Sequence, residues 1–94
     1  MQGGGRRIRG KFLVVVAAPG PDADGRAGLA VSRKVGNAVV RNRVKRWLRE
    51  SLRFLAGRFP PGRDLVLIAQ PSAATAGLLA LREELAAALD RVSP

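Results

Sequence analysis

The sequence predicts a small two-layer α+β sandwich, in which helices pack against one β-sheet. Its 94 residues suffice for a single domain, which we place at 1–94. Three apolar runs rich in β-branched residues or leucine are bounded by Gly, Pro or charged residues, and two longer stretches repeat apolar residues with the 3.6-residue period of a helix. With a shorter strand before them, these segments read β-β-β-α-β-α in chain order. The strands must therefore bury their apolar side chains against the helices.

The N-terminal part supplies two of the predicted strands. Residues 1–5 contain three glycines, which cannot support a stable helix, so we expect a flexible start before a short strand at 7–9. Residues 11–18, KFLVVVAA, lie between Gly10 and Pro19 and have the Phe and Val content typical of a strand. Because this run is apolar on both faces, we expect both faces to be covered.

Two further strands complete the predicted sheet. Residues 26–32, RAGLAVS, follow a turn at 20–25 whose two acidic side chains place it away from any bound polyanion. The turn is too short for a crossover, and we therefore expect 26–32 to pair with 11–18 as an antiparallel hairpin. Residues 64–69, DLVLIA, are strongly apolar and predict a strand that is central or covered on both faces. The strand–helix–strand unit that ends there could have either strand polarity.

A basic amphipathic helix is predicted at 37–55. Counting from Val40, six apolar residues and one serine fall at offsets 0, 4, 7, 8, 11, 12 and 15, which is one stripe of the helical period. Asn37 suits the N-cap, because its side-chain oxygen can accept a hydrogen bond from an unpaired N–H group of the first turn. Gly57 and Pro60 then favour an end to the helix.

The charges on this segment indicate a surface for a polyanion. Residues 33–53 carry eight basic side chains and a single acidic one, Glu50, and so hold +7 of the chain's formal net charge of +10. Most of the basic residues lie opposite the apolar stripe, where an ordinary solvated face would mix in glutamates. Most are Arg, whose planar fork grips phosphate oxygens. Asn42 among them could read a base edge, bind a phosphate, help hold a hydrated metal, or be only an exposed polar residue.

A second helix is predicted near the C-terminus. We expect it to begin in the region 72–75, with Ser72 or Thr75 as its cap, and to run to about Val92. Its apolar stripe comprises Leu78, Leu81, Leu85 and Leu89. Its surface mixes acidic and basic residues, so we interpret it as a packing helix.

The composition excludes several classes of function. With no Cys and no His, the chain has no disulfide, zinc finger, thiol or imidazole catalysis. The seven acidic residues are scattered and form no metal-binding set by spacing, so we expect no catalytic residue and no metal site in this chain. No run approaches the roughly 18 apolar residues of a membrane span, and no signal peptide is evident, so we expect a cytoplasmic protein. A strand stands where a DNA-binding helix-turn-helix needs a helix, and the sheet needs the apolar stripe that a membrane-surface helix would expose.

Residues 31–50, VSRKVGNAVVRNRVKRWLRE, resemble the signature of the bacterial ribonuclease P protein subunit. The pattern K-x-G-x-A-x-x-R-N-R-x-K-R is present in order and without gaps, after a strand that ends in Gly-Leu-x-Val-Ser. The resemblance extends from Gly5 to about Val92. It implies a left-handed crossover, an exception to the usual right-handed rule. The family also has a helix before the first strand, with aromatic side chains that line one wall of a cleft, and that segment is missing from this sequence.

The resemblance implies an RNA-binding subunit that assists a catalytic RNA in removing the 5′ leader from precursor tRNA. Its partners would be the ribonuclease P RNA and precursor tRNA with its leader, and Mg²⁺ would be bound mainly by RNA, with none in the protein alone. The residues matched to RNA contacts are Arg33, Lys34, Arg41, Asn42, Arg43, Lys45, Arg46 and Arg49. Further candidates, for a cleft that holds the leader, are Lys11, Phe12, Val15 and Ser32. We interpret Trp47 as packing at the core edge, with stacking on RNA as the alternative. A ribosomal or other general RNA-binding protein is the alternative function.

Overall fold

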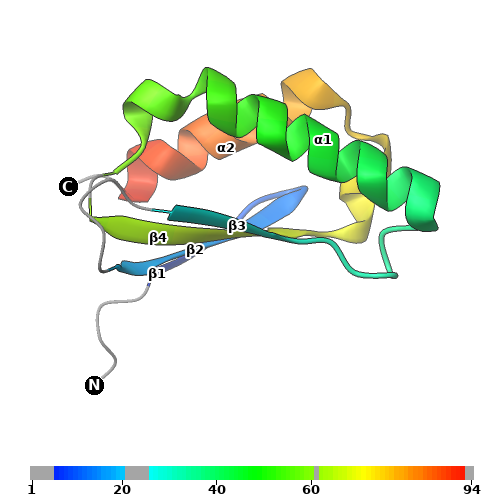
Figure 1. The fold of residues 1–94 in the computed structure, drawn as a ribbon, viewed down its shortest axis with the longest axis horizontal. Coiled ribbons are helices and arrows are strands. Elements are labelled where there is room, and N and C mark those ends of the chain that lie inside the picture. Colours follow the sequence, from blue (N-terminus) through cyan, green and yellow to red (C-terminus); the bar gives the residue numbers. More distant parts are fainter. Residues whose placement is uncertain (1–5, 21–25, 61, 93–94) are drawn as a thin grey trace.

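The computed structural model describes residues 6–20, 26–60 and 62–92 and shows a two-layer α+β sandwich (Figure 1). The predicted flexible start and most of the predicted turn at 20–25 lie outside these residues. The elements are β1 (Arg6–Arg9), β2 (Leu13–Pro19), β3 (Arg26–Ala30), α1 (Ala38–Phe54), the short 3-10 helix η1 (Ala56–Arg58), β4 (Arg63–Ala69), a second 3-10 helix η2 (Pro71–Thr75) and α2 (Leu78–Val92). The predicted fold class is confirmed.

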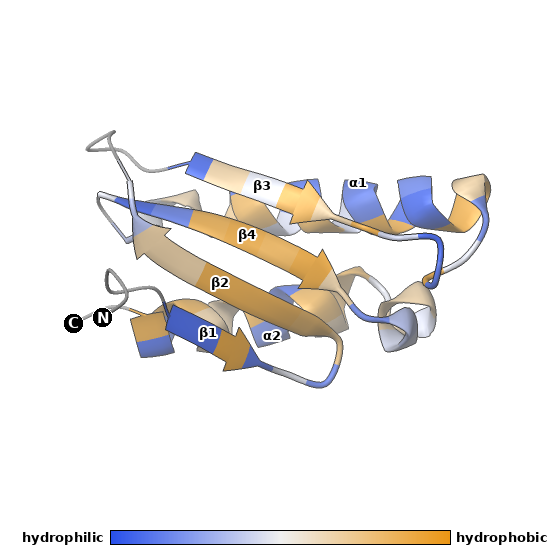
Figure 2. Cartoon of the chain, turned by 90° about the horizontal axis from the view of Figure 1, so that it is seen from below, coloured by the Kyte–Doolittle hydropathy of each residue, from blue (hydrophilic) through white to orange (hydrophobic). Residues whose placement is uncertain are grey.

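The four strands form one mixed sheet in the order β1-β2-β4-β3. Strand β2 is antiparallel to both of its neighbours, with Val15 opposite Leu67 of β4, whereas β3 runs parallel to β4, with Leu29 opposite Leu67. The chain passes from β3 through α1 to the adjacent parallel strand β4. Seen with the helices behind the sheet, this crossover is left-handed (Figure 2). The handedness that the family resemblance implied is therefore confirmed.

The predicted hairpin between the first two long strands is wrong. Strands β2 and β3 are antiparallel to each other, as expected, but β4 lies between them and pairs with both. Two strand spacings are about 10 Å, and the six residues that join Pro19 to Arg26 can span about 20 Å, so the connection reaches over one intervening strand. Strand β4 is strongly apolar and lies inside the sheet, where both of its edges are paired with other strands.

Both helices cover the same face of the sheet (Figure 1). The core between the layers is built from aliphatic side chains, among them Leu13, Val15, Val44, Leu48, Leu65, Leu67, Leu81, Leu85 and Leu89. In the described part of the chain no helix covers the opposite face, which we call the bare face, and Val66 of β4 is 40% exposed there. The expectation that residues 11–18 are covered on both faces is therefore wrong. Val14 on the bare face is nevertheless buried, because β1 and β4 flank β2 on both sides.

Helix α1 begins and ends within one residue of the predicted bounds. The side-chain oxygen of Asn37 accepts a hydrogen bond of 3.0 Å from the backbone N–H of Val40, as the predicted N-cap requires. Gly36, just before the cap, has φ +158°, and a Cβ there would lie 2.8 Å from the side chain of Val40. A glycine is needed at this position because the chain enters the helix against the first turn.

The predicted start of the C-terminal helix is wrong by several residues. Residues 71–75 form the separate helix η2, and α2 begins at Leu78, after Gly77 with φ +86°. Since this left-handed conformation cannot continue a helix, Gly77 separates the two elements. Ser72 caps neither: its hydroxyl donates a 2.7 Å hydrogen bond to the carbonyl oxygen of Lys11.

Candidate nucleic-acid interface

The outer side of α1 carries a basic surface because the helical period separates its apolar and charged residues. Val44, Leu48 and Ser51 are buried toward the core. The residues on the opposite side are Asn42, Arg43, Arg46 and Arg49, which with the exposed Val39 line one shallow hollow on the surface. We call these four polar side chains the outer basic face. Half of the predicted RNA-binding residues are thus brought together on a single face of one helix.

The other predicted RNA-binding residues lie apart from the outer basic face. Arg41 and Lys45 are half-buried on the flank of α1 that points away from α2, and the Nε of Arg41 has no hydrogen-bond partner among the described residues. Arg33 and Lys34 are exposed in the turn between β3 and α1, where the carbonyl oxygen of Arg33 accepts a hydrogen bond from Gly36. A polyanion that engaged all eight residues would have to contact two sides of α1.

The basic residues of this region are almost free of acidic partners. Within residues 6–20, 26–60 and 62–92, Arg46 is the one of the seven predicted cations that forms an ion pair, at 3.8 Å from Glu50. That pair is exposed and joins successive turns, a geometry that contributes only a few tenths of a kcal/mol. The positive charge of α1 is therefore not neutralised within the fold, and it repels itself unless an anion binds.

The predicted cleft residues occupy one end of the sheet, except for Val15. Lys11 and Phe12 form the turn between β1 and β2, with the Lys11 ammonium 5.4 Å from the centre of the Phe12 ring. Ser32 follows β3 at the same end, and its Oγ accepts a 3.3 Å hydrogen bond from the N–H of Lys34. Val15 was the wrong choice, because it is 1% exposed and lies in the core.

Sequence reasoning missed the side chains that cover the bare face. Alternation along β2 places Val16 on that face, beside Val66 of β4 and the exposed Arg7 of β1 in one row of the sheet. Arg9 lies on the same side in the next row. Figure 2, which colours each described residue by its hydropathy, shows β2 and most of β4 as hydrophobic and β1 as mostly hydrophilic. The one signal available was the period-2 alternation of β1, RRIR, which buries Ile8 and exposes its arginine neighbours.

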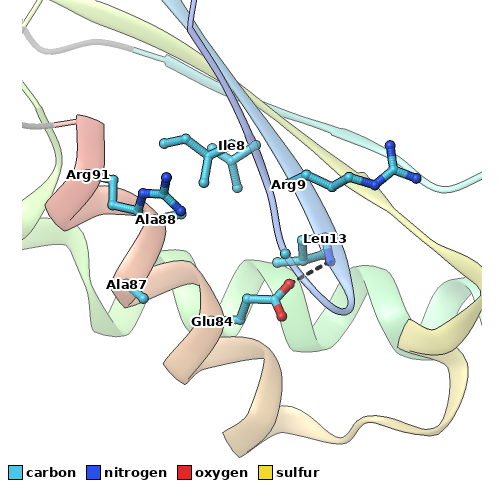
Figure 3. Close-up of a pocket in the computed structure, with 9 residues that line it drawn as sticks. Ile8, Arg9, Leu13, Glu84, Ala87, Ala88 and Arg91 are labelled. Carbon is cyan, nitrogen blue, oxygen red and sulfur yellow. Dashed lines mark hydrogen bonds between the residues drawn. The ribbon is translucent and has the colours of Figure 1, made fainter.

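The turn that carries Lys11 and Phe12 is held by a carboxylate from α2. Glu84 accepts hydrogen bonds from three successive backbone N–H groups, those of Lys11 at 2.8 Å, Phe12 at 2.9 Å and Leu13 at 2.6 Å. Figure 3 shows the last of these. A Cβ on Gly10 would lie 2.5 Å from this carboxylate, so a larger residue there would displace Glu84 from its hydrogen bonds. Beside it lies a cavity of about 80 Å³, which is mostly apolar and lined in part by β1, β2 and α2. Sequence reasoning had assigned Glu84 to a solvated surface.

The described residues contain neither a metal-binding cluster nor a membrane-spanning helix. Among them no group of three or more His, Cys, Asp or Glu side chains could hold a metal ion. Neither is there, in the part of the chain that the structure describes, a helix long and apolar enough to cross a membrane. Trp47 is half-buried and packs against the core, as its interpretation as a core-edge residue predicted.

A small sandwich whose helix α1 carries a row of guanidinium groups, with Glu50 as their one ion-pair partner among the described residues, has the features of a nucleic-acid-binding protein. Comparison with known proteins narrows this class. The sequence profile of the family described as Ribonuclease P matches residues 2–93. The chain therefore belongs to the ribonuclease P protein family.

Individual relatives agree with this assignment. The chain is 42% identical over 84 residues to the ribonuclease P protein component of Brevibacillus brevis, which covers 89% of this chain and 67% of the relative. It is 47% identical over 85 residues to that of Thermus aquaticus, covering 90% of this chain and 49% of the relative. The corresponding protein of Thermus oshimai is 46% identical over 87 residues, with 93% and 54% covered. The chain thus spans only about half the length of the two Thermus relatives.

Solved structures share the fold. The ribonuclease P protein from Thermotoga maritima superposes with a TM-score of 0.86 at 30% sequence identity, covering 97% of this chain and 86% of that protein. The ribonuclease P protein from Staphylococcus aureus gives a TM-score of 0.81 at 29% identity, covering 94% and 81%. These values extend the likeness from the signature around α1 to nearly the whole chain.

Proposed function

We propose that this chain is the protein subunit of ribonuclease P and assists a catalytic RNA in the endonucleolytic removal of the 5′ leader from precursor tRNA. The observation that carries the proposal is the outer basic face of α1, which lacks acidic partners among the described residues apart from the exposed Glu50. Membership of the family supports RNA as the polyanion. Precursor tRNA is the substrate, and the cytoplasm is where the chain would meet it.

In this proposal the protein contributes binding and charge neutralisation, and the RNA contributes the chemistry. The catalytic RNA and the precursor are both polyanions, so they repel each other when they associate. The guanidinium groups of Arg43, Arg46 and Arg49 would lie against phosphates and reduce this repulsion, and each can donate two parallel hydrogen bonds to one phosphate. Arg33, Lys34, Arg41 and Lys45 would extend the contact around the helix, and Asn42 would add a neutral donor and acceptor.

The proposed path of the single-stranded leader is the bare face of the sheet. Lys11 and Phe12 stand at one end of that face, with Ser32 at the same end of the neighbouring parallel strands. The apolar strip along β2 and β4 would contact bases, while Arg7 and Arg9 would contact phosphates at the β1 edge. Such contacts would raise the affinity for precursor over mature tRNA, because only the precursor carries a leader.

Magnesium belongs to the RNA in this proposal. The described acidic side chains do not cluster, so they do not fit a divalent ion bound to this chain. Mg²⁺ would be held mainly by the catalytic RNA, which would carry out the hydrolysis of the phosphodiester bond. The protein residues would hold the two RNAs in place around that centre.

A reconstitution experiment tests the proposed function. The protein is mixed with a bacterial ribonuclease P RNA and a labelled precursor tRNA at a magnesium concentration too low for the RNA alone. We expect 5′ cleavage to appear with the protein and to be absent when the protein is incubated with precursor alone. A general RNA-binding or ribosomal protein would bind these RNAs without stimulating cleavage at the 5′ site, and cleavage by the polypeptide alone would refute the division of labour.

A further inference from the structure

The end of α1 carries an exposed aromatic ring that is not part of the outer basic face. Phe54, the last residue of α1, is 66% exposed, although it is one of only four aromatic residues in the chain. The guanidinium carbon of Arg82, from α2, lies 3.9 Å from the centre of its ring. One face of the ring is thus covered by a planar cation, and the high exposure leaves the opposite face open to solvent.

The stacked pair adjoins the surface assigned to RNA. Phe54 lies five residues after Arg49, about 7 Å farther along the helix axis, and next to the exposed Arg53. The helical period turns it toward α2 and away from the flank that carries Arg41 and Lys45. On α2, Leu79 lies one turn before Arg82 on the same side and is 62% exposed. The outer basic face therefore continues into an aromatic, cationic and apolar surface where the two helices meet.

Internal packing does not account for this arrangement. A cation–π contact at an exposed site stabilises a fold only slightly, and a phenylalanine there still leaves most of its apolar surface in water. Phe54 contributes nothing to the buried core, whereas its neighbour Leu55 is fully part of it. A ring held in place by a cation on one side and open on the other is better suited to contact a ligand.

The chemistry of the pair favours an unpaired nucleobase. Bases of single-stranded RNA stack on aromatic rings and on guanidinium planes, and this contact tolerates any base because every base has a π-face. The surrounding charge favours the same ligand, since Arg49, Arg53 and Arg82 outnumber Glu50, one turn before Phe54, and would attract the phosphates on either side of the base. A second copy of the chain is a poor occupant, because each copy carries a formal charge of +10.

We propose that Phe54 and Arg82 form a stacking site for an unpaired base of the bound RNA, at the end of the outer basic face. The site rests on the proposed function in that RNA is the partner. It adds a contact to a base, where the outer basic face supplies contacts to phosphates. The two kinds of contact respond differently to salt, because only the phosphate contacts release counterions.

The experiment compares variants of Phe54 in binding to ribonuclease P RNA over a range of monovalent salt. Phe54→Leu keeps the apolar bulk and removes the ring, and we expect its affinity to fall at least about fivefold with an unchanged salt slope. Phe54→Trp keeps a ring and should bind like the original protein. Arg91→Gln, at an exposed position of α2 nine residues after Arg82, is the control and should change the affinity by less than about threefold. Circular dichroism and thermal melting establish that each variant is folded.

A spectroscopic readout separates stacking from a merely structural effect. In a Trp47→Phe background, the tryptophan of Phe54→Trp is the only one in the chain, and RNA binding should quench its fluorescence. Equal RNA affinity of Phe54→Leu and the original protein, or an unquenched tryptophan in the bound complex, would overturn the stacking site. A variant that lost only self-association or binding to anionic vesicles would overturn it as well. If the unmodified protein fails to bind the RNA or to stimulate 5′ cleavage, the proposed function itself fails, which distinguishes the two results.

Discussion

The two long helices lie side by side on one face of the sheet, yet they use their charged residues in opposite ways (Figure 1). On α2, Glu84 holds the backbone of the β1–β2 turn, and Asp90 accepts a hydrogen bond from Arg58 of η1. On α1, Arg43 and Arg49 have no ion-pair partner within the described residues. The charges of α2 therefore stabilise the fold, whereas those of α1 cost stability through mutual repulsion and are available to a partner.

This difference shows how function can be located in a small basic domain. A net charge of +10 says that the chain binds anions somewhere, but it does not say where. Charged residues that already form ion pairs or backbone hydrogen bonds inside the fold are poor candidates, even when they are partly exposed. Within residues 6–20, 26–60 and 62–92, many of the cations without an ion-pair partner lie on α1 and in the turn before it, which is where the sequence signature of the family also lies, and others lie on β1. Substitutions in the outer basic face of α1 and at the acidic residues of α2 should therefore have opposite signatures, with RNA affinity affected by the first and stability by the second.

The largest effect is expected from the triple variant Arg43→Gln, Arg46→Gln and Arg49→Gln. Removing three of about six phosphate contacts should lower RNA affinity at least about 100-fold at 0.1 M salt and reduce the log–log salt slope from about −5 to about −3. Fluorescence anisotropy with labelled RNA measures both quantities. The melting temperature should stay the same or rise, since like charges on neighbouring turns no longer repel.

The exposed Arg91 of α2 provides the control for that variant. Arg91→Gln removes a cation from the other helix and should change RNA affinity by less than about threefold, the effect of one remote charge. Unfolding of the triple variant, or an equally large loss of affinity with Arg91→Gln, would mean that the two helices do not differ in the way proposed.

Among substitutions of the acidic residues of α2, Glu84→Ala should cause the largest loss of stability. It leaves three backbone N–H groups of the β1–β2 turn without their acceptor, and we expect a loss of about 2 to 3 kcal/mol in the free energy of unfolding. Urea denaturation measures it. The neighbouring Glu83 is exposed, so Glu83→Ala should change stability by less than about 0.5 kcal/mol. Equal stabilities of the two variants would show that the hydrogen bonds of Glu84 do not stabilise the β1–β2 turn.

A smaller effect is expected from the N-cap of α1. Asn37→Ala removes the acceptor of the Val40 N–H group and should cost about 1 kcal/mol of stability. Asn37→Asp keeps an acceptor, adds a negative charge at the positive end of the helix, and should be at least as stable as the original. Both values come from the same denaturation curves. A destabilised Asn37→Asp variant would show that the cap acts through something other than this hydrogen bond.

The smallest effect is expected from the ion pair between Arg58 and Asp90. Both side chains are largely exposed, so Asp90→Asn should reduce stability by no more than about 0.5 kcal/mol at low salt and by less at high salt. RNA affinity should hardly change. If Asp90→Asn destabilised the protein as much as Glu84→Ala, the exposed ion pair of Asp90 would stabilise the fold as much as the three backbone hydrogen bonds of Glu84. That result would contradict the difference proposed between them.

The helix α1 could be predicted from the sequence because its determinants are local. Its apolar period, its Asn37 cap and its arginines all lie within one stretch of chain, and together they placed most of the candidate interface. The face of β2 could not be predicted, because KFLVVVAA has apolar residues at both parities and so no alternation to separate Val15 from Val14 and Val16. The strand order could not be predicted from the sequence either, because β4 inserts between β2 and β3 through contacts that only the assembled sheet provides.

Contacts between residues far apart in the chain could not be predicted from the sequence either. Phe54 and Arg82 are 28 residues apart, and their stacking depends on how α1 and α2 cross, which no local pattern encodes. Glu84 and the β1–β2 turn lie more than 70 residues apart. In both cases the sequence gives the residue types, and tertiary packing decides which of them meet.

The hydrogen bonds of Glu84 join two segments that are made at very different times. During synthesis the β1–β2 turn leaves the ribosome well before α2, so its three amide groups must wait for their acceptor. Strand β4, which lies inside the sheet, also follows the edge strand β3 beside it. The domain can therefore close as a unit only after α2 has been made, and a truncation before residue 84 would leave the β1–β2 turn unanchored.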